Sequence, residues 1–220
     1  MMKACLFDLD GVLVDTAIYH FRAWGELAQK YNFEFTEEHN EKLKGVSRMD
    51  SLEILMKLGS FGLNHEQKLK EASWKNEIYC SYIETLTPND ILPGVKEFLD
   101  ALKVSGIGIA LGSASKNAPS ILERLEITSY FDAIIDGNQV SNAKPDPEVF
   151  LKGAEQLGVA PSDCIVFEDA EAGVEAAIRG GMKCVGVGSP EVLARADMVI
   201  SNFNELSLDI LITKMDREVA

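Results

Sequence analysis

Short runs of apolar residues alternate along the chain with longer stretches in which apolar residues recur at helical spacing. The apolar runs cover residues 3–7, 107–111, 133–135, 164–167, 184–187 and 198–200. One helical stretch covers 95–102, and another covers 149–157, where Asp146 is the expected N-cap and Pro147 the expected first helical residue. Strands that alternate with helices and are apolar at nearly every position are typical of a parallel sheet covered on both faces. The pattern therefore predicts an α/β fold with a Rossmann-like, doubly wound parallel sheet.

The interval from residue 16 to residue 82 breaks this alternation, because it holds helical patterns and no convincing strand. One apolar stripe consists of Phe21, Trp24, Leu27, Ala28 and Tyr31. Residues 47–58 and 66–83 have the spacing of two further helices. The simplest explanation is a helical bundle inserted after the first strand, with the chain returning to the sheet near Pro88 and Pro93.

The insertion divides the chain into two predicted parts. The first is a discontinuous catalytic core, residues 1–14 and 93–220, and the second is a helical cap, residues 15–92, which includes two hinge linkers. Two linkers permit hinge closure of the cap over a site on the core. The sequence holds no internal repeat and no low-complexity segment.

Charge and cysteine content narrow the range of functions. The 220 residues include 21 Lys and Arg against 35 Asp and Glu, for a formal net charge of −14. This balance argues against binding to nucleic acid or to an anionic membrane surface, and no apolar run approaches the roughly 18 residues of a membrane span. Asp8 and Asp10 come too early for a signal peptide, and the four scattered cysteines form no CxxC pair. We therefore expect a cytoplasmic protein with reduced cysteines; the sequence leaves the oligomeric state open, and a monomer is our expectation.

Residues able to do chemistry follow three of the apolar runs. These residues are Asp8, Asp10, Ser113, Glu168 and Asp169, and Lys144 precedes the last predicted helix start. In open α/β sheets ligands bind at the carboxyl ends of the strands, so these groups are expected to converge at one edge. Four carboxylates need a cation to share a small site, and with no His or Cys nearby a hard ion such as Mg²⁺ is expected. Each short pattern is common by itself, and their shared placement carries the hypothesis.

A phosphate group suits such a site, because the metal recruits an anionic substrate to an acidic protein. Asp8 can act as a nucleophile and form an aspartyl-phosphate, and Asp10 can protonate the leaving oxygen. Ser113 and nearby backbone N–H groups can hold phosphoryl oxygens, and Lys144 can neutralise charge that grows during transfer. The glycines of residues 106–112 miss the dinucleotide-binding spacing, which argues against a nucleotide cofactor.

The order of these residues resembles the haloacid dehalogenase superfamily. Its first motif resembles FDLDGVLVDT at residues 7–16, and Ser113, Lys144 and the pair Glu168–Asp169 match its second, third and fourth motifs. The resemblance covers nearly the whole chain, including a helical cap after the first motif. The Mg²⁺ ligands that it implies are Asp8, the backbone carbonyl of Asp10, Glu168 and Asp169. True dehalogenases lack the second Asp and the metal, so Asp10 points to phosphoryl transfer.

Within that superfamily the cap is most similar to the β-phosphoglucomutase family. The matching segments are residues 20–24, 43–48, 75–76 and 113–117. The substrate-binding residues that this similarity implies are His20, Trp24, Gly45, Val46, Ser47, Arg48, Lys75, Ser113, Ala114, Ser115, Lys116 and Asn117. Arg48 is expected to grip the phosphate that is not being transferred, and His20 to help position Asp10. Gly112 and Ala118 depart from the family's usual residues, in both cases one small residue for another.

The resemblance implies a Mg²⁺-dependent phosphomutase that interconverts β-D-glucose 1-phosphate and β-D-glucose 6-phosphate. It would do so through an aspartyl-phosphate enzyme and a glucose 1,6-bisphosphate intermediate, so its partners would be these sugar phosphates. Two alternatives stay open at this point. A capped sugar-phosphate or phosphoglycolate-like phosphatase shares all the core motifs. A phosphorylation switch of the receiver type also uses acids, Mg²⁺, a hydroxyl and a Lys, but Asp10 and the helical cap oppose it.

Overall fold

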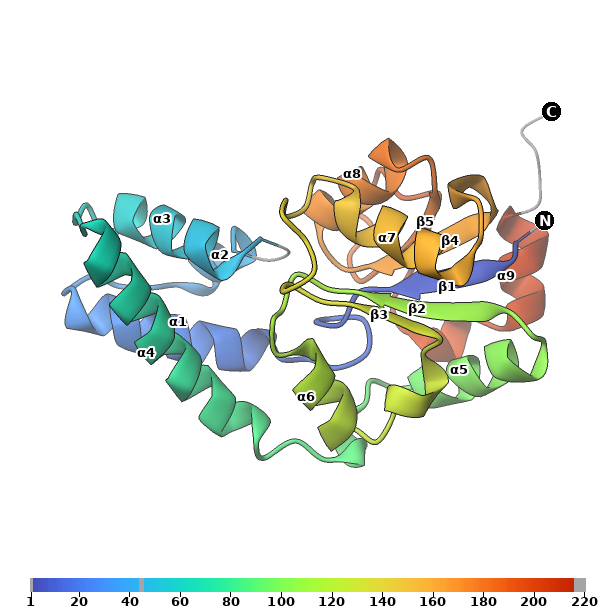
Figure 1. Ribbon diagram of the computed structural model, residues 1–220, viewed down its shortest axis with the longest axis horizontal. Coiled ribbons are helices and arrows are strands. Elements are labelled where there is room, and N and C mark those ends of the chain that lie inside the picture. Colours follow the sequence, from blue (N-terminus) through green and yellow to red (C-terminus); the bar gives the residue numbers. More distant parts are fainter. Residues whose placement is uncertain (1, 44–45, 216–220) are drawn as a thin grey trace.

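One parallel sheet lies at the centre of the catalytic core (Figure 1). In this computed structural model the described residues are 2–43 and 46–215, and among them six strands form the sheet. The strands are β1 (Ala4–Phe7), β2 (Gly108–Gly112), β3 (Ala133–Ile135), β4 (Cys164–Glu168), β5 (Lys183–Val187) and β6 (Met198–Ile200). Their order is β3-β2-β1-β4-β5-β6, and every neighbouring pair is parallel. The predicted doubly wound sheet is confirmed.

Helices cover both faces of this sheet and bury both sides of each central strand. One face packs against α7 (Glu148–Leu157) and α8 (Glu171–Arg179), and the other against α5 (Val95–Val104), α6 (Ala118–Arg124) and α9 (Leu208–Met215). Along β1, Ala4 and Leu6 belong to the first apolar core, whereas Cys5 and Phe7 belong to the second. This double burial is the reason that the strands are apolar at consecutive positions.

The start of α7 differs from the prediction by one residue. Its N-cap is Pro147, not Asp146. The backbone N–H of Asp146 donates to the carbonyl of Ala143 at 3.0 Å, which keeps Asp146 in the preceding turn. Its carboxylate still accepts a hydrogen bond from the N–H of Glu148 at 3.0 Å, so Asp146 caps the helix from outside it.

The predicted helical insertion is confirmed, and Figure 1 shows it standing apart from the sheet. Its helices are α1 (Ala17–Lys30), α2 (Glu37–Glu41), α3 (Arg48–Leu58) and α4 (His65–Ile83). They enclose a third apolar core, formed around Trp24, Leu27, Leu52 and Leu55. Only α2 has no counterpart in the sequence pattern, because a helix of this length shows no periodicity.

The two linkers between cap and core lie side by side. The N–H of Leu92 donates to the carbonyl of Leu13 at 2.9 Å, and Val14 pairs with Ile91 in an antiparallel bridge. The cap therefore joins the core through a short two-stranded connection. The exact domain boundaries, at residues 14–15 and 92–93, stay a prediction.

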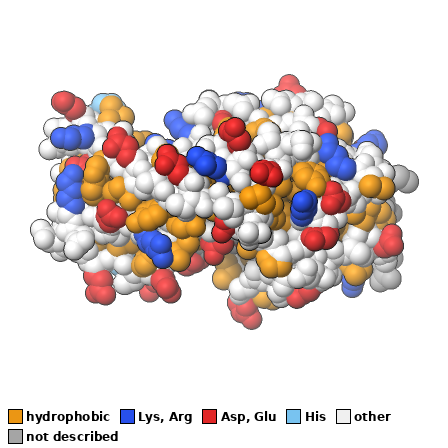
Figure 2. Space-filling view, turned by 90° about the horizontal axis from the view of Figure 1, so that it is seen from below, with side chains coloured by type: hydrophobic (Ala, Val, Ile, Leu, Met, Phe, Trp, Pro, Cys, Tyr) orange, Lys and Arg blue, Asp and Glu red, His pale blue; other side chains and the backbone are white. Residues whose placement is uncertain are grey.

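Charged side chains of both signs are interspersed on the surface. Figure 2 shows acidic and basic groups mixed on one face, where no continuous basic stripe is visible. Among helices of the described segments, none is both long and apolar enough to cross a membrane.

Candidate active site

The register of the sheet brings the reactive side chains to one edge. Phe7 of β1 pairs with Leu111 of β2 and with Phe167 of β4. The N–H of Asp8 donates to the carbonyl of Phe167 at 3.0 Å, which continues the ladder by one residue. Asp8 and Glu168 consequently lie at the same level, at the carboxyl ends of adjacent strands, as the sequence predicted.

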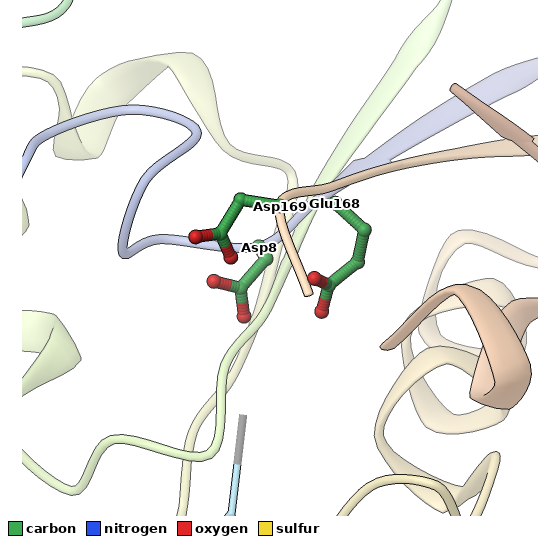
Figure 3. A group of neighbouring side chains, drawn as sticks. All are labelled: Asp8, Glu168 and Asp169. Carbon is green, nitrogen blue, oxygen red and sulfur yellow. The ribbon is translucent and has the colours of Figure 1, made fainter. Parts of the chain in front are cut away.

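Three carboxylates meet at this edge, those of Asp8, Glu168 and Asp169 (Figure 3). Each offers an oxygen, and these oxygens lie within 4.8 Å of one another. Asp8 is 7% exposed and Glu168 is 1% exposed, so water screens their repulsion only weakly. A set of carboxylate oxygens at this separation fits a hard divalent cation such as Mg²⁺ better than a metal that prefers nitrogen or sulfur.

Lys144 lies between two of these carboxylates. Its Nζ is 2.5 Å from Asp8 Oδ1 and 2.5 Å from Glu168 Oε1. Burial alone would favour the neutral amine, but the two carboxylates raise the pKa of Lys144 above its ordinary value. Burial raises the pKa of Glu168, and Lys144 opposes that shift. One ammonium among three carboxylates leaves the set negative, and a bound cation would balance it.

Two glycines make room for these carboxylates. A Cβ at Gly173, in the first turn of α8, would lie 1.8 Å from Glu168 Oε1. A Cβ at Gly11 would lie 2.2 Å from Asp169 Oδ2. Neither glycine is among the predicted site residues, because motif reasoning searched for side chains that do chemistry.

Asp10 lies beside the carboxylates, two residues after Asp8. It accepts a hydrogen bond from the hydroxyl of Thr16, the residue before α1. Desolvation raises the pKa of Asp10 to about 8, and the charge of Asp8 adds to the shift. A carboxyl group with this pKa holds a proton at neutral pH and can also give it up, as a general acid and base must.

In the cap, Lys75 of α4 is 1% exposed and has no carboxylate partner among the ion pairs of the described residues. Its Nζ lies 2.8 Å from His20 Nδ1, 4.6 Å from the ring centre of Trp24 and 4.7 Å from that of Tyr79. Desolvation and the nearby Arg48 lower the pKa of Lys75 to about 7. Burial and Lys75 likewise lower the pKa of His20 well below its ordinary value. The pair is therefore held with less positive charge than two free side chains would carry.

Arg48 is the first residue of α3 and lines the same cavity. Ser47 is the N-cap: its Oγ accepts from the N–H of Asp50 at 3.2 Å and donates to the Asp50 carboxylate at 2.5 Å. This cap fixes where the helix begins and so the position of Arg48. Burial lowers the pKa of Arg48, but an arginine keeps its proton at physiological pH.

The turn after β2 supplies the core side of the cavity. The Ser113 hydroxyl accepts from the N–H of Ser115 at 3.1 Å, and the Ser115 hydroxyl accepts from the N–H of Asn117 at 3.2 Å. The Asn117 side chain donates to Asn76 Oδ1 at 2.9 Å, which connects the core to α4 of the cap. These bonds hold the turn in one shape beneath the cap.

One cavity of about 200 Å³ brings most predicted residues together. Of the predicted residues, those that line it are Asp8, Asp10, His20, Trp24, Val46, Ser47, Arg48, Lys75, Ser113, Ala114, Ser115, Lys116, Asn117 and Asp169. Lys144 and Glu168 lie behind Asp8 through the contacts given above. Gly45 lies outside the described residues.

The cavity also has lining residues that the prediction did not include. They include Asn40, Leu43, Asp50, Ser51, Asn76 and the segment 140–143. Ser51 is one helical turn after Arg48, so periodicity offered a signal for it. No comparable signal marks Asn40, since α2 itself was not predicted.

Comparisons with known proteins agree with this geometry. Residues 2–181 match the family model described as haloacid dehalogenase-like hydrolase. The chain is 44% identical to the β-phosphoglucomutase of Bacillus subtilis over 96% of this chain and 94% of that protein. It is 36% identical to a phosphorylated carbohydrates phosphatase of Thermotoga maritima over 83% of each. The crystal structure of β-phosphoglucomutase from Clostridium difficile superposes with a TM-score of 0.95 and 43% identity, covering 98% of both chains.

The close approach of Gly173 to Glu168 yields a test of the carboxylate set. In Gly173→Ala the new Cβ should displace the Glu168 carboxyl group, although Ala favours a helix over Gly by about 1 kcal/mol. We expect Mn²⁺ affinity, measured by electron paramagnetic resonance, to fall at least about tenfold, or about 1.4 kcal/mol. Gly25→Ala is the matched control, because a Cβ there meets nothing within 4 Å. Full Mn²⁺ affinity in Gly173→Ala would contradict the role given to Glu168.

The raised pKa of Asp10 predicts a pH-dependent cost to the metal-free protein. The folded protein binds the Asp10 proton more tightly than the unfolded chain does. The contribution of Asp10 to the free energy of unfolding is therefore fully present at low pH. That contribution is lost as the pH rises from about 4 toward the folded pKa of about 8. Asp10→Asn should therefore gain stability relative to the wild type across this window, by up to about 1.4 kcal/mol per pH unit, and level off above it. Urea unfolding in a chelator at several pH values measures the difference, and a difference independent of pH would disprove the shift.

Proposed function

The chain belongs to the haloacid dehalogenase-like hydrolase family, and we propose that within it the chain acts as a β-phosphoglucomutase. The observation that carries this proposal is one cavity lined both by the carboxylate of Asp8 and by two cationic side chains, which could provide two phosphate sites. Asp8 and its carboxylate neighbours lie at one end, while Arg48 of the cap and Lys116 of the core line the same space. A phosphatase needs one phosphate site, whereas a mutase with a bisphosphate intermediate needs two.

The first half-reaction moves a phosphoryl group from Asp8 to the sugar. The C6 hydroxyl of β-glucose 1-phosphate attacks the phosphorus carried on Asp8, and the bond between phosphorus and the Asp8 oxygen breaks. Asp10 takes the hydroxyl proton as the new bond forms. The product is β-glucose 1,6-bisphosphate, and Asp8 returns to a carboxylate that Lys144 holds by a direct contact.

The second half-reaction runs the same chemistry on the other end of the sugar. The bisphosphate reorients so that its C1 phosphate faces Asp8, and an Asp8 oxygen attacks the phosphorus of that C1 phosphate. The C1 oxygen leaves with the proton that Asp10 carries, which yields glucose 6-phosphate and restores the phosphorylated Asp8. Arg48 suits the phosphate that waits, because a guanidinium fork binds a dianion through two parallel hydrogen bonds.

The metal part of the proposal rests on the carboxylate set. Asp8, the backbone carbonyl of Asp10, Glu168 and Asp169 would hold Mg²⁺. When bound, Mg²⁺ supplies positive charge that offsets the phosphoryl oxygens and the carboxylates. Ser113, which lines the cavity, and Lys144, which contacts Asp8 and Glu168, contribute their own hydrogen bonds and charge.

The cap contributes by keeping water from the phosphorylated Asp8. Its residues His20, Trp24 and Lys75 pack together and line the same cavity as Asp10. Cap closure of this kind favours transfer to a sugar over hydrolysis. We also propose that the protein works in the cytoplasm as a monomer; its four free cysteines support a reducing compartment.

The proposed function is tested by following phosphorus directly. With purified protein, Mg²⁺, β-glucose 1-phosphate and a trace of glucose 1,6-bisphosphate, ³¹P NMR should show glucose 6-phosphate as the main product. Inorganic phosphate as the main product would favour the phosphatase.

Replacing the nucleophile should abolish the reaction. Asp8→Asn removes the carboxylate that accepts the phosphoryl group, so mutase activity and acid-stable phosphate labelling should both disappear. Mass spectrometry after incubation with acetyl phosphate measures the label. A label retained in Asp8→Asn would show that another residue is the nucleophile.

Replacing Arg48 should separate the two phosphate sites. Arg48→Ala removes a charge-assisted phosphate clamp worth about 1.5–3 kcal/mol, so the mutase reaction should slow by roughly 10- to 150-fold. Phosphorylation of Asp8 by acetyl phosphate, a donor with no second phosphate, should stay nearly unchanged. Equal loss with both donors would assign Arg48 to the fold or to cap closure, and no loss with either would move the second site elsewhere.

A further inference from the structure

Asn40 projects from α2 at a position that the local structure fixes firmly. The N–H of His39 donates to the Thr36 hydroxyl at 3.3 Å, and the N–H of Thr36 donates to His39 Nδ1 at 3.2 Å. The N–H of Asn40 donates to the Thr36 carbonyl at 3.1 Å, and the Asn40 carbonyl accepts from the N–H of Leu43 at 2.9 Å. The backbone of this residue is therefore satisfied on both sides, and its side chain is left for another purpose.

Asn40 is a buried residue whose side-chain amide makes no hydrogen bond to the described residues, and the amide atoms are open to the cavity rather than fully enclosed by protein. It is 7% exposed and lines the cavity between cap and core. Among the buried Asp, Glu, Lys, Asn, Ser and Thr side chains that the structure describes, only those of Asn40 and Ser51 make no hydrogen bond or ion pair, and the buried hydroxyl of Tyr79 is also without a partner. Buried amides are normally bonded, since leaving one unbonded costs free energy, so an amide that faces a cavity unbonded points to a ligand.

Several polar side chains of the cavity, unlike the Ser51 hydroxyl, are already bonded or charged. Asn117 is bonded to Asn76, and His20 to Lys75. Arg48 and Lys116 carry full charges that suit phosphate. Asn40 differs from these because its neutral carboxamide is unbonded, so it offers a free donor and a free acceptor side by side. That combination matches a sugar hydroxyl, which also donates and accepts, and it matches a phosphate dianion poorly, because the amide oxygen would face negative charge.

We propose that Asn40 is a specificity-determining residue whose carboxamide binds a hydroxyl group of the sugar ring. The proposal rests on the proposed function for the nature of the substrate. It gives the cap a means of distinguishing sugars that carry the same phosphates but differ in the direction of one hydroxyl. A site that pairs a buried polar group with a hydroxyl rejects the epimer, because the epimer leaves that group unpaired.

The test compares β-glucose 1-phosphate with its C2, C3 and C4 epimers as 1-phosphates. In Asn40→Leu, kcat/KM for β-glucose 1-phosphate should fall about 10- to 100-fold, and the preference over one epimer should shrink by a similar factor. Phosphorylation of Asp8 by acetyl phosphate, which has no hydroxyl, should be unchanged. Asn40→Asp keeps the shape and an acceptor but loses the donor, and it serves if the leucine variant folds poorly.

A structural role for Asn40 gives different results. Thr36→Ala loosens the start of α2 without changing the cavity wall, so it should slow all epimers by the same factor. If Asn40→Leu does the same, or changes nothing, the proposal is wrong. Product analysis scores sugar phosphate and inorganic phosphate separately, so the epimer preference is measurable even if the protein proves to be a phosphatase.

A binding readout complements the kinetics. The side-chain NH₂ resonances of Asn40, assigned by their loss in Asn40→Leu, should shift when glucose 6-phosphate is added. Inorganic phosphate alone should leave them in place. Equal shifts with both ligands would assign Asn40 to a phosphate site and overturn the proposal.

Discussion

The placement of three carboxylates at the buried edge of a parallel sheet is the constraint on which the rest of the site depends. The central strands are apolar on both faces, so Asp8 and Glu168 emerge from them with little water to screen their charges. Lys144 reaches across from the loop before α7 and contacts both. Gly173 leaves the space that Glu168 occupies, so the first turn of α8 is shaped by the same requirement. The strand register, the loop that carries Lys144 and the start of α8 therefore all serve to accommodate this group of buried charges.

The cap lines the cavity with cationic and polar side chains while the positive charge near Asp10 stays low. Burial lowers the pKa of Lys75 to about 7 and the pKa of His20 well below its ordinary value, and two aromatic rings pack against the Lys75 amine. Arg48 keeps its charge at the start of α3. The cavity thus has a gradient, from a fixed guanidinium, through a pair with reduced charge, to the carboxylates of the core.

Most of the fold could be predicted from the sequence because it depends on burial, which leaves a mark at every position. All strands were located from apolar runs, and the core site followed from what stands at their ends. The details that escaped prediction leave no such mark. Helix α2 is too short to show helical periodicity, and Asn40 was not predicted as a site residue because it lies in this helix. The exact N-cap of α7 depended on a turn bond of Asp146 that no pattern reveals. Gly173 was missed because its contribution is the absence of a side chain. Whether the predicted residues perform their roles, and where the cap begins and ends, are matters for the experiments above.

The hydrogen bond between Asn117 and Asn76 affects how a ligand enters and leaves the cavity. A neutral hydrogen bond contributes about 1 kcal/mol net, which alters the ratio of closed to open molecules only about fivefold. A hydrogen bond of that strength favours the closed cap but is broken readily by thermal motion, so it cannot by itself prevent a ligand from dissociating. A bisphosphate that has to reorient between half-reactions can be released and rebound on the timescale of ordinary domain motion. The contacts of the bisphosphate itself, rather than this one hydrogen bond, then determine how long the cap stays closed.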